Sequence, residues 1–344
     1  MIRLELLSRP APDAVTGMTF PAYRHLLQLR PALRLLADAS RPPVQPVAVV
    51  AFDGDAPVGL ALAELPLVAG DSPELLSLFV DRAHRGHGLG RRLVRAVEEE
   101  VASRGFGTMR TVWTAGRPGS PAFERVLTAC EWTPPTPRTL SVRFTVEEAE
   151  SFPWLHRYPL RDGCEIFPWA ELTDGERAAL RMSQQATGWI KPDLVPWQYD
   201  ANGFESVTSV GMRCAGEVVG WVINHQTAPT TLRFTCAYIR KDLGRRGRIM
   251  PLFSASIGRL RQGGFTECTF VTPMRHQTMI AFIRRWMAPW VGFLEETRGS
   301  ERDLASATSR AVVDARSGRR SAGGGGGSVV FAGAVNRGEL KEPE

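Results

Sequence analysis

The feature that most constrains the fold of this chain is an internal repeat. Two apolar, strand-like runs, 74–80 (ELLSLFV) and 233–239 (RFTCAYI), each lead into an arginine-rich loop. A Gly-Phe pair follows the end of each run after 25 residues, and an Ala-Phe pair follows after a further 17. Every landmark therefore recurs at one constant sequence offset, without a gap. This register predicts a tandem duplication, and hence two domains of one fold.

The segments around these landmarks indicate the elements of each half. Segments 47–65 and 210–226 each join two apolar runs through a short turn, Asp-Gly in the first and Ala-Gly in the second, which is typical of a hairpin. Thr173 and Glu176 form the capping box of a helix. Another helix is predicted because apolar side chains recur every four residues at Leu89, Leu93, Val97 and Val101. Each half is expected to contain, in order, a strand, one or two helices, a hairpin, a strand, a helix, a strand and a helix.

Composition places the chain among soluble globular proteins. Apolar residues make up 43% and charged residues 23% of the 344 residues, enough for two domains with cores. No apolar stretch is long enough to span a membrane as a helix, and the first residues do not resemble a signal peptide. We therefore expect no membrane span and a cytoplasmic location.

The net charge of +6 suits a polyanionic ligand such as a nucleotide cofactor. Nucleic acid is not favoured, because the arginines lack interleaved aromatic residues. We expect no metal, since the histidines are scattered and no metal-binding spacing occurs. The cysteines never form a CxxC pair and are expected to be buried reduced thiols: Cys130, Cys164, Cys214, Cys236 and Cys268.

A glycine-rich loop follows the first of the two apolar runs. The segment 80–94 (VDRAHRGHGLGRRLV) leads from a strand through three glycines into an apolar-faced helix. Backbone N–H groups at such a helix start can bind phosphate. The loop has no Walker A lysine, and the spacing Gly86-x-Gly88-x-Gly90 does not fit the Rossmann fingerprint. Both common nucleotide-binding folds are therefore disfavoured.

The spacing Arg85-x-x-Gly88-x-Gly90 resembles the signature of the GNAT superfamily of acyl-CoA-dependent N-acyltransferases. The resemblance extends over most of residues 1–145, because the hairpin, the strand and the segment GSPAFERVLTACEW occur in that family's order. It implies an α/β fold of two tandem GNAT-like domains. Each would be a twisted mixed sheet flanked by helices and splayed after strand 74–80 or its repeat.

The resemblance also implies where acyl-CoA would bind. The pantetheine arm would pair with the main chain of Phe79 and Val80, and Arg85 and Arg91 would add positive charge. The pyrophosphate would be held by the amides of Gly86, His87, Gly88, Leu89, Gly90 and Arg91.

In the second half, the three signature positions become Gly244, Gly247 and Ile249. Only one of them keeps the signature. We therefore expect the second half to have kept the fold and lost cofactor binding.

Proton transfer requires a general base, and the resemblance points to Glu74 at the start of the strand. The repeat has Arg233 at this point. The alternative is that Glu74 is an exposed strand-end carboxylate. The tyrosine that many relatives use as a general acid falls on Leu127, so an acid would be dispensable, replaced by water or supplied from the second half.

The predicted organisation is a catalytic domain at 1–146, a degenerate GNAT-like domain at 164–314 that shapes the acceptor site, and a glycine-rich tail at 315–344. The tail is either a natural flexible segment or an engineered linker that carries a peptide. Segment 187–200, rich in tryptophan and proline, is either a lid or groove lining or a loop packed on its own domain.

The predicted function is transfer of an acyl group, most simply acetyl from acetyl-CoA, to a primary amine of a peptide or peptide natural product. A small amino sugar or amino acid is an alternative acceptor. A non-catalytic acyl-CoA sensor or scaffold is the alternative from another class.

Overall fold

The structure is a computed structural model that describes residues 1–8, 10–28, 44–67, 70–243 and 248–305. The chain divides into two compact units. Unit 1 consists of Met1–Pro137 and the described residues from Thr297 onward, and unit 2 consists of Arg138–Glu296. The glycine positions 244 and 247 and the predicted tail at 315–344 lie outside the described residues.

Unit 1 is built on a six-strand run of sheet in the order β1-β2-β3-β4-β5-β12. Its strands are β1 (Ile2–Leu6), β2 (Val44–Asp53), β3 (Ala56–Pro66), β4 (Glu74–Val80), β5 (Thr108–Thr114) and the second part of β12 (Phe293–Asp303). Its helices are α1 (Asp13–Thr16), η1 (Pro21–Tyr23), α2 (His25–Gln28), η3 (Arg82–His84), α3 (Leu89–Ser103) and α4 (Ser120–Ala129).

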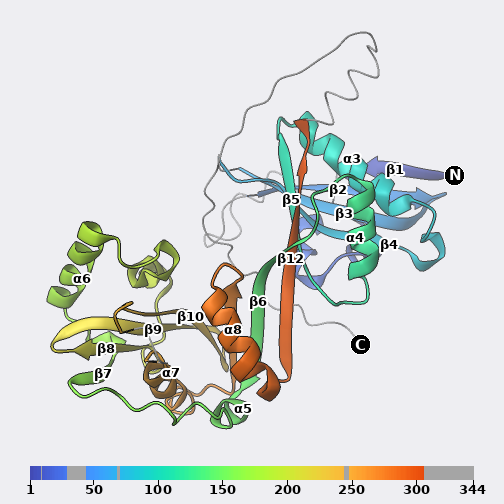
Figure 1. The fold of residues 1–344 in the computed structure, drawn as a ribbon. Coiled ribbons are helices and arrows are strands. Elements are labelled where there is room, and N and C mark those ends of the chain that lie inside the picture. The colour runs from blue at the N-terminus through green and yellow to red at the C-terminus, as the bar shows by residue number, and fades with distance from the viewer. Residues whose placement is uncertain (9, 29–43, 68–69, 244–247, 306–344) are drawn as a thin grey trace. The chain divides into compact units, whose positions relative to one another are not determined.

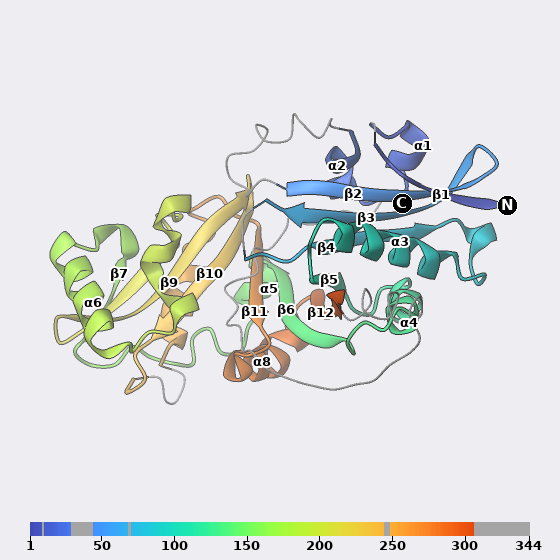
Figure 2. The same ribbon diagram turned by 90° about the horizontal axis from the view of Figure 1, so that it is seen from above.

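Helices cover both faces of this sheet (Figure 2). Helices α1 and α2 lie on one face, where Leu60 and Leu62 of β3 belong to a buried cluster with Val15 and Leu27. Helices α3 and α4 lie on the other face. The predicted apolar stripe of α3 is buried there, since Leu89, Leu93, Val97 and Val101 are each at most 3% exposed. The period-four pattern in the sequence is thus confirmed as the core face of α3.

Unit 2 repeats this plan with the strand order β6-β11-β10-β9-β8-β7. Its strands are β6 (Thr136–Thr145), β7 (Cys164–Pro168), β8 (Val210–Cys214), β9 (Glu217–Ala228), β10 (Thr231–Ile239) and β11 (Glu267–Pro273). Its helices are α5 (Val146–Glu150), η4 (Trp169–Glu171), α6 (Asp174–Thr187), η5 (Pro192–Leu194), η6 (Pro196–Asn202), α7 (Met250–Ile257), α8 (Gln277–Phe282), η7 (Ile283–Met287, a π-helix) and η8 (Ala288–Trp290). The capping box of Thr173 and Glu176 at the start of α6 is confirmed.

The tandem repeat is confirmed in the details of strand pairing. Strand β4 has an irregularity at Leu76 where it pairs with β3, and β10 has one at Thr235 where it pairs with β9. The parallel pairing of β4 with β5 ends at Leu75, and that of β10 with β11 ends at Phe234. Both pairs of positions are separated by the same offset as the landmarks of the sequence repeat. The mixed α/β fold built twice in tandem is therefore confirmed.

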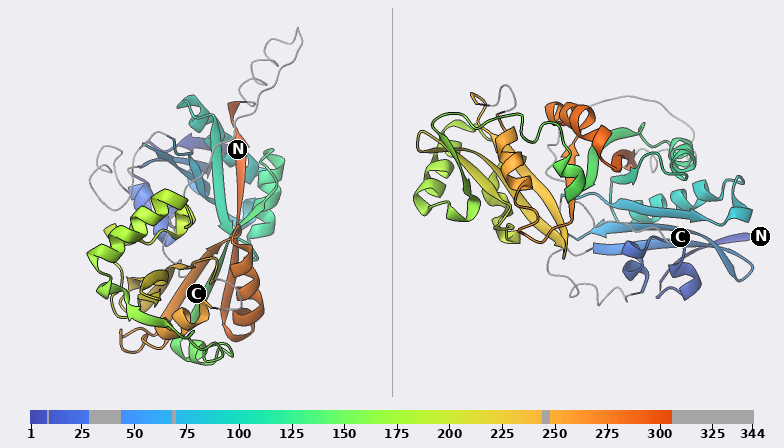
Figure 3. Two further views of the ribbon diagram at one scale, coloured as in Figure 1. Left: turned by 60° about the vertical axis from the view of Figure 1, so that its left-hand side comes forward. Right: turned by 90° about the horizontal axis from the view of Figure 1, so that it is seen from below.

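The last strand of each sequence half completes the sheet of the other unit, which the sequence analysis did not predict. Strand β12 pairs antiparallel with β5 through Thr297–Asp303, as Figures 1 and 3 show within unit 1. Strand β6 pairs antiparallel with β11 through Thr139–Thr145. The compact units consequently do not coincide with the expected segments 1–146 and 164–314. Pairing of strands distant in sequence decides this exchange, and local patterning does not encode it.

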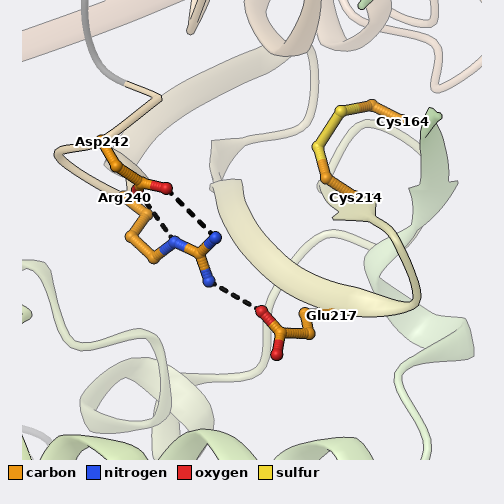
Figure 4. Close-up of a disulfide and its surroundings, with 5 residues drawn as sticks. All are labelled: Cys164, Cys214, Glu217, Arg240 and Asp242. Atoms are coloured by element: carbon orange, nitrogen blue, oxygen red, sulfur yellow. Dashed lines mark hydrogen bonds and ion pairs between the residues drawn. A yellow bond between two sulfur atoms is a disulfide. The ribbon is translucent and has the colours of Figure 1, made fainter. Parts of the chain in front are cut away.

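The prediction that all five cysteines are reduced thiols is wrong for one pair. Cys164 and Cys214 lie directly opposite each other on β7 and β8, with Cα atoms 4.1 Å apart, and form a disulfide (Figure 4). They are 50 residues apart in sequence, so no CxxC spacing could reveal the pair. The other three, Cys130, Cys236 and Cys268, are buried and free as predicted.

Candidate functional site

The sheet of unit 1 opens between β4 and β5. The two strands are parallel, but they pair only at Glu74 with Arg110 and at Leu75 with Thr111. Beyond Leu75, β4 continues to pair with β3 as far as Val80. The part of β4 that contains Phe79 and Val80 is therefore separated from β5. The predicted splay of the sheet at this strand is confirmed.

Thr111 closes the base of this opening, and sequence reasoning did not single it out. Its hydroxyl donates a hydrogen bond of 2.8 Å to the carbonyl oxygen of Leu75, and the residue is 1% exposed. This hydrogen bond links β5 to Leu75, the last residue of β4 that pairs with β5. A lone threonine in a strand gives no signal in the sequence that could have identified this role.

The glycine loop connects the open end of β4 to α3. Asp81 accepts a hydrogen bond from the amide of Ala83 and caps the short helix η3. Gly86 and Gly88 follow with φ of 82° and 78°, in the left-handed region. Gly88 is the N-cap of α3 and carries no side chain that could accept from the amides of the first helical turn. Those amides lie at the positive end of a 15-residue helix without an acidic side chain in its first turn.

The three glycines serve two different purposes. A Cβ atom on Gly86 or Gly88 would meet no heavy atom within 4 Å, so the loop backbone is open to a ligand there. A Cβ atom on Gly90 would lie 3.3 Å from Cγ2 of Val126 on α4. Gly90 thus allows the start of α3 to pack against α4, whereas positive φ requires glycine at the other two positions.

The arginines of the loop lie at its exposed surface. Nε of Arg85 donates a hydrogen bond of 2.9 Å to the carbonyl oxygen of Val80, which fixes this side chain at the end of β4. His87 and Arg91 are exposed beside it. Arg92 donates to the carbonyl oxygen of Ile2, so its charge faces β1. The loop therefore combines open backbone with positive charge.

Glu74 lies at the base of the opening and is largely buried. Its side chain is 14% exposed, and its Oε2 lies 3.2 Å from Nε of Arg110 on β5. Glu64 of β3 is directly opposite Glu74 and is 9% exposed. The alternative that Glu74 is an exposed strand-end carboxylate does not describe this geometry. Arg110 and Glu64 are the neighbours that sequence reasoning missed, because cross-strand register brings them together.

Leu127, at the expected position of a general acid, lies in the core of unit 1. It is 1% exposed and packs in the cluster that includes Leu93 and Trp132. No hydroxyl group occupies this place. The chain therefore differs from relatives that use a tyrosine here.

The corresponding region of unit 2 has different chemistry. Arg240 occupies the position of Asp81 and forms ion pairs with Glu217 and Asp242, both at 2.9 Å (Figure 4). Ile249, the counterpart of Gly90, packs against the apolar core at the start of α7. The loop positions 244–247 lie outside the described residues.

Segment 187–200 packs on its own unit. Trp189, Trp197 and Tyr199 contact the cluster that contains Trp221 and Tyr238. Asp193 binds the segment to the end of β11, because its Oδ2 lies 2.6 Å from both His276 Nε2 and Arg275 Nη2. These contacts agree with the alternative that the segment is a loop packed on its own domain.

Membrane spans and metal sites are considered for the described part of the chain. No helix there is long and apolar enough to cross a membrane. Among the same residues, no group of three or more histidine, cysteine or acidic side chains could hold a metal ion.

Comparison with known proteins indicates the family of unit 1 and the fold of the chain. Residues 13–123 match the model of the Acetyltransferase (GNAT) family. The structure is similar to a GCN5-related N-acetyltransferase from Sphaerobacter thermophilus, with a TM-score of 0.54 and 15% identity over 87% of this chain and 96% of that one. It is also similar to a tandem GNAT protein from the clavulanic acid biosynthesis pathway, with a TM-score of 0.50 and 13% identity over 88% and 99%. No curated protein matches the sequence.

Unit 1 thus carries a domain of an acetyltransferase family. The fold of the chain as a whole is similar to that of a tandem GNAT protein, as the sequence resemblance implied, and the family match itself covers residues 13–123.

Proposed function

We propose that this protein is an acyl-CoA-dependent N-acyltransferase whose unit 1 transfers an acyl group, most simply acetyl, directly to a primary amine. The observation that carries the proposal is the glycine loop at the open end of β4. Its two left-handed glycines leave the backbone uncovered beside the start of α3. That arrangement suits the diphosphate of coenzyme A.

The residues around the opening fit acyl-CoA. The main chain of Phe79 and Val80 lies where β4 has left β5, so it can pair with the amide groups of the pantetheine arm. The amides from Gly86 to Arg91 would hold the diphosphate, with Arg85 and Arg91 adding charge. The thioester supplies an activated acyl group when bound.

Glu74 is proposed as the general base. An amine of pKa near 10.4 is neutral in fewer than about one molecule in a thousand at pH 7, so the acceptor must lose a proton before it attacks. A positioned base contributes about 10²–10⁴ in rate. Glu74 lies at the base of the opening, and Arg110 orients its carboxylate.

Two variants test this proposal. Gly88→Trp should abolish binding of acetyl-CoA in calorimetry, because an indole ring would fill the open space at the loop. Glu74→Gln should leave that binding unchanged and lower the acylation rate of an amine panel by at least about 100-fold. A Glu74→Gln rate equal to wild type across pH would remove this residue from the mechanism.

The alternative function is a non-catalytic acyl-CoA sensor or scaffold. The burial of Leu127 favours it, because no side-chain acid stands where relatives have a tyrosine. Binding of acetyl-CoA without release of free thiol in the presence of any amine or peptide would support this alternative.

A peptide amine is the proposed acceptor, with a small amino sugar or amino acid as the alternative. Unit 2 is proposed to shape the acceptor site without binding cofactor. We propose a cytoplasmic location, in keeping with the soluble enzymes of the family.

A further inference from the structure

Unit 2 contains a cavity of about 20 Å³ between its sheet and the helices α7 and α8. Its walls are five phenylalanines together with Trp154, Ile257 and Met287. Two of the phenylalanines, Phe234 of β10 and Phe270 of β11, lie directly opposite each other in the sheet. We refer to this space as the apolar cavity. At this volume it admits one water-sized group without movement of its walls.

Trp154 brings an unsatisfied hydrogen-bond donor to the apolar cavity. It lies in the segment after α5, is 2% exposed, and its ring centroid is 5.4 Å from that of Phe282. Among the residues that the structure describes, none offers an acceptor within hydrogen-bond distance of Trp154 Nε1. A buried N–H group without a partner carries its full cost of desolvation. An acceptor placed beside it would therefore be stabilised.

A water molecule does not suit this donor. A buried water usually makes about three hydrogen bonds, and the described side chains around the cavity supply one strong donor and no strong acceptor. The phenyl rings, Ile257 and the thioether of Met287 would leave the other hydrogen bonds of a water unmade. A carbonyl oxygen on an apolar molecule needs one donor only, and its carbon atoms can contact these walls.

The sequence repeat shows what unit 1 has at the same place. Ile257 corresponds to Glu98 in the repeat. Through the strand register, Phe144 of β6 corresponds to Arg302 of β12. In unit 1, Glu98 lies 4.0 Å from Arg302 and accepts a hydrogen bond of 2.6 Å from the indole of Trp132. Unit 1 thus satisfies a buried indole with a carboxylate, whereas unit 2 has an isoleucine at that position and an indole without an acceptor.

A π-helical turn forms one wall of the apolar cavity. Phe282 ends α8, and η7 follows at once and brings Met287 to the cavity. The corresponding segment of unit 1 lies within α4, which is α-helical throughout. Turns of π-helix are rare and occur frequently at functional sites. Because Met287 is flexible and Phe282 is only partly buried, this wall can shift to admit a ligand larger than one water.

We propose that the apolar cavity of unit 2 binds a small apolar molecule with one carbonyl oxygen, such as a ketone, aldehyde or ester. The carbonyl oxygen accepts a hydrogen bond from Trp154 Nε1, and the carbon atoms contact Phe253 and Ile257. This site goes beyond the proposed acyl transfer, because every residue that lines it belongs to unit 2 and lies outside the family match at residues 13–123.

Proton–nitrogen NMR spectra of the tryptophan-labelled full chain test the hydrogen bond, with cyclopentanone as the probe and no coenzyme present. The indole N–H signal of Trp154, assigned through its backbone signals, should move downfield and saturate. The indole signal of Trp189 is the internal control. Its Nε1 is also buried without a partner among the described residues, but Trp189 packs against Trp221 and does not line the cavity. This signal should not move.

A second measurement separates the hydrogen bond from apolar burial alone. The affinities for cyclopentanone and cyclopentane are measured from the methyl signals of Ile257 and Met287, in wild type and in Trp154→Phe. This substitution removes the donor and keeps an aromatic ring. The affinity for cyclopentanone relative to that for cyclopentane should therefore fall by at least about tenfold. Gly88→Trp should keep both affinities, which separates this site from the proposed coenzyme site.

Three results would overturn the proposal. One is an indole signal of Trp154 that cyclopentanone does not move saturably. Another is an equal shift at Trp189, which would indicate non-specific partitioning among aromatic side chains. The third is an unchanged ratio of the two affinities in Trp154→Phe protein that is folded, as judged by its thermal unfolding. The first two need only the wild-type protein, so they decide the matter even if the variant does not fold.

Discussion

At the scale of single residues, the glycines of the loop are required for different physical reasons. Gly88 has φ of 78° and open space around it, so only the backbone conformation excludes other residues. Gly90 lies in the helix, and the tightest contact that a Cβ atom there would make is with Cγ2 of Val126 at 3.3 Å. The sequence pattern Gly-x-Gly-x-Gly does not separate these two cases.

The distinction predicts different stabilities for two alanine variants. Gly88→Ala should lower the free energy of unfolding by about 1–2 kcal/mol, the cost of a left-handed residue with a Cβ. Gly90→Ala should change it by less than about 0.5 kcal/mol, because alanine favours the helix and the Val126 side chain can shift. Urea unfolding followed by circular dichroism measures both. Equal losses in the two variants would contradict the assignment.

Arg302 of β12 is a second residue whose role follows from its neighbours. It is 6% exposed, donates to the carbonyl oxygen of Glu131 at 2.8 Å, and has Nε 4.0 Å from Glu98 of α3. Glu98 also accepts from Trp132 Nε1 at 2.6 Å. Burial raises the pKa of Glu98 above its usual value, although these partners oppose the shift.

Arg302→Ala should therefore destabilise unit 1 in a pH-dependent way. Removal of one partner of a buried charge costs about 3 kcal/mol. A raised carboxyl pKa means that the folded state holds the proton more tightly, so its stability falls as pH rises through that pKa. The loss on substitution should be larger at pH 8 than at pH 5, measured by urea unfolding at both values. Arg261→Ala, at an exposed ion pair, should change stability by less than about 0.5 kcal/mol at either pH.

At the scale of elements, most of what the sequence predicted is confirmed. The hairpins, the strand at 74–80, the helix after the glycine loop and the capping box of α6 follow from local patterns. The final strands β6 and β12 were missed. Both strands mix polar and apolar residues without a clear pattern. Their pairing partners, β11 and β5, are distant in sequence.

The disulfide between β7 and β8 also depends on strand pairing. It closes a loop of 50 residues, for which loop-closure entropy gives a stabilisation of about 4 kcal/mol. A reductant should lower the melting temperature of the wild-type protein, and Cys214→Ser should melt at the reduced value. The reductant should leave the melting of Cys214→Ser itself unchanged. Identical melting of the oxidised and reduced wild type would show that the bond does not stabilise unit 2.

At the scale of the whole molecule, exchange of the last strands makes each unit depend on both halves of the sequence. Unit 1 needs Thr297–Asp303 beside β5, and unit 2 needs Thr139–Thr145 beside β11. A cut near residue 146 would leave β5 with an unpaired edge. It would also remove the ion pair between Arg302 and the buried Glu98.

Residues 1–146 expressed alone should therefore show no cooperative unfolding transition. A matched fragment in which residues 1–135 are joined by a short linker to residues 296–305 should fold, because it restores the partner of β5. Thermal unfolding followed by circular dichroism compares the two fragments. A cooperative transition in the 1–146 fragment, equal to that of the matched fragment, would show that unit 1 does not need β12 to fold.

The sequence by itself determined the duplicated α/β plan, the position of the glycine loop and the place of Glu74 on its strand. These depend on local periodicity, turn chemistry and a constant offset between the two halves, all of which can be read along the chain. Only the tertiary structure decided the strand exchange, the Cys164–Cys214 pair and the neighbours of Glu74. Each of these depends on which strand lies beside which, because cross-strand register joins residues that no sequence spacing connects.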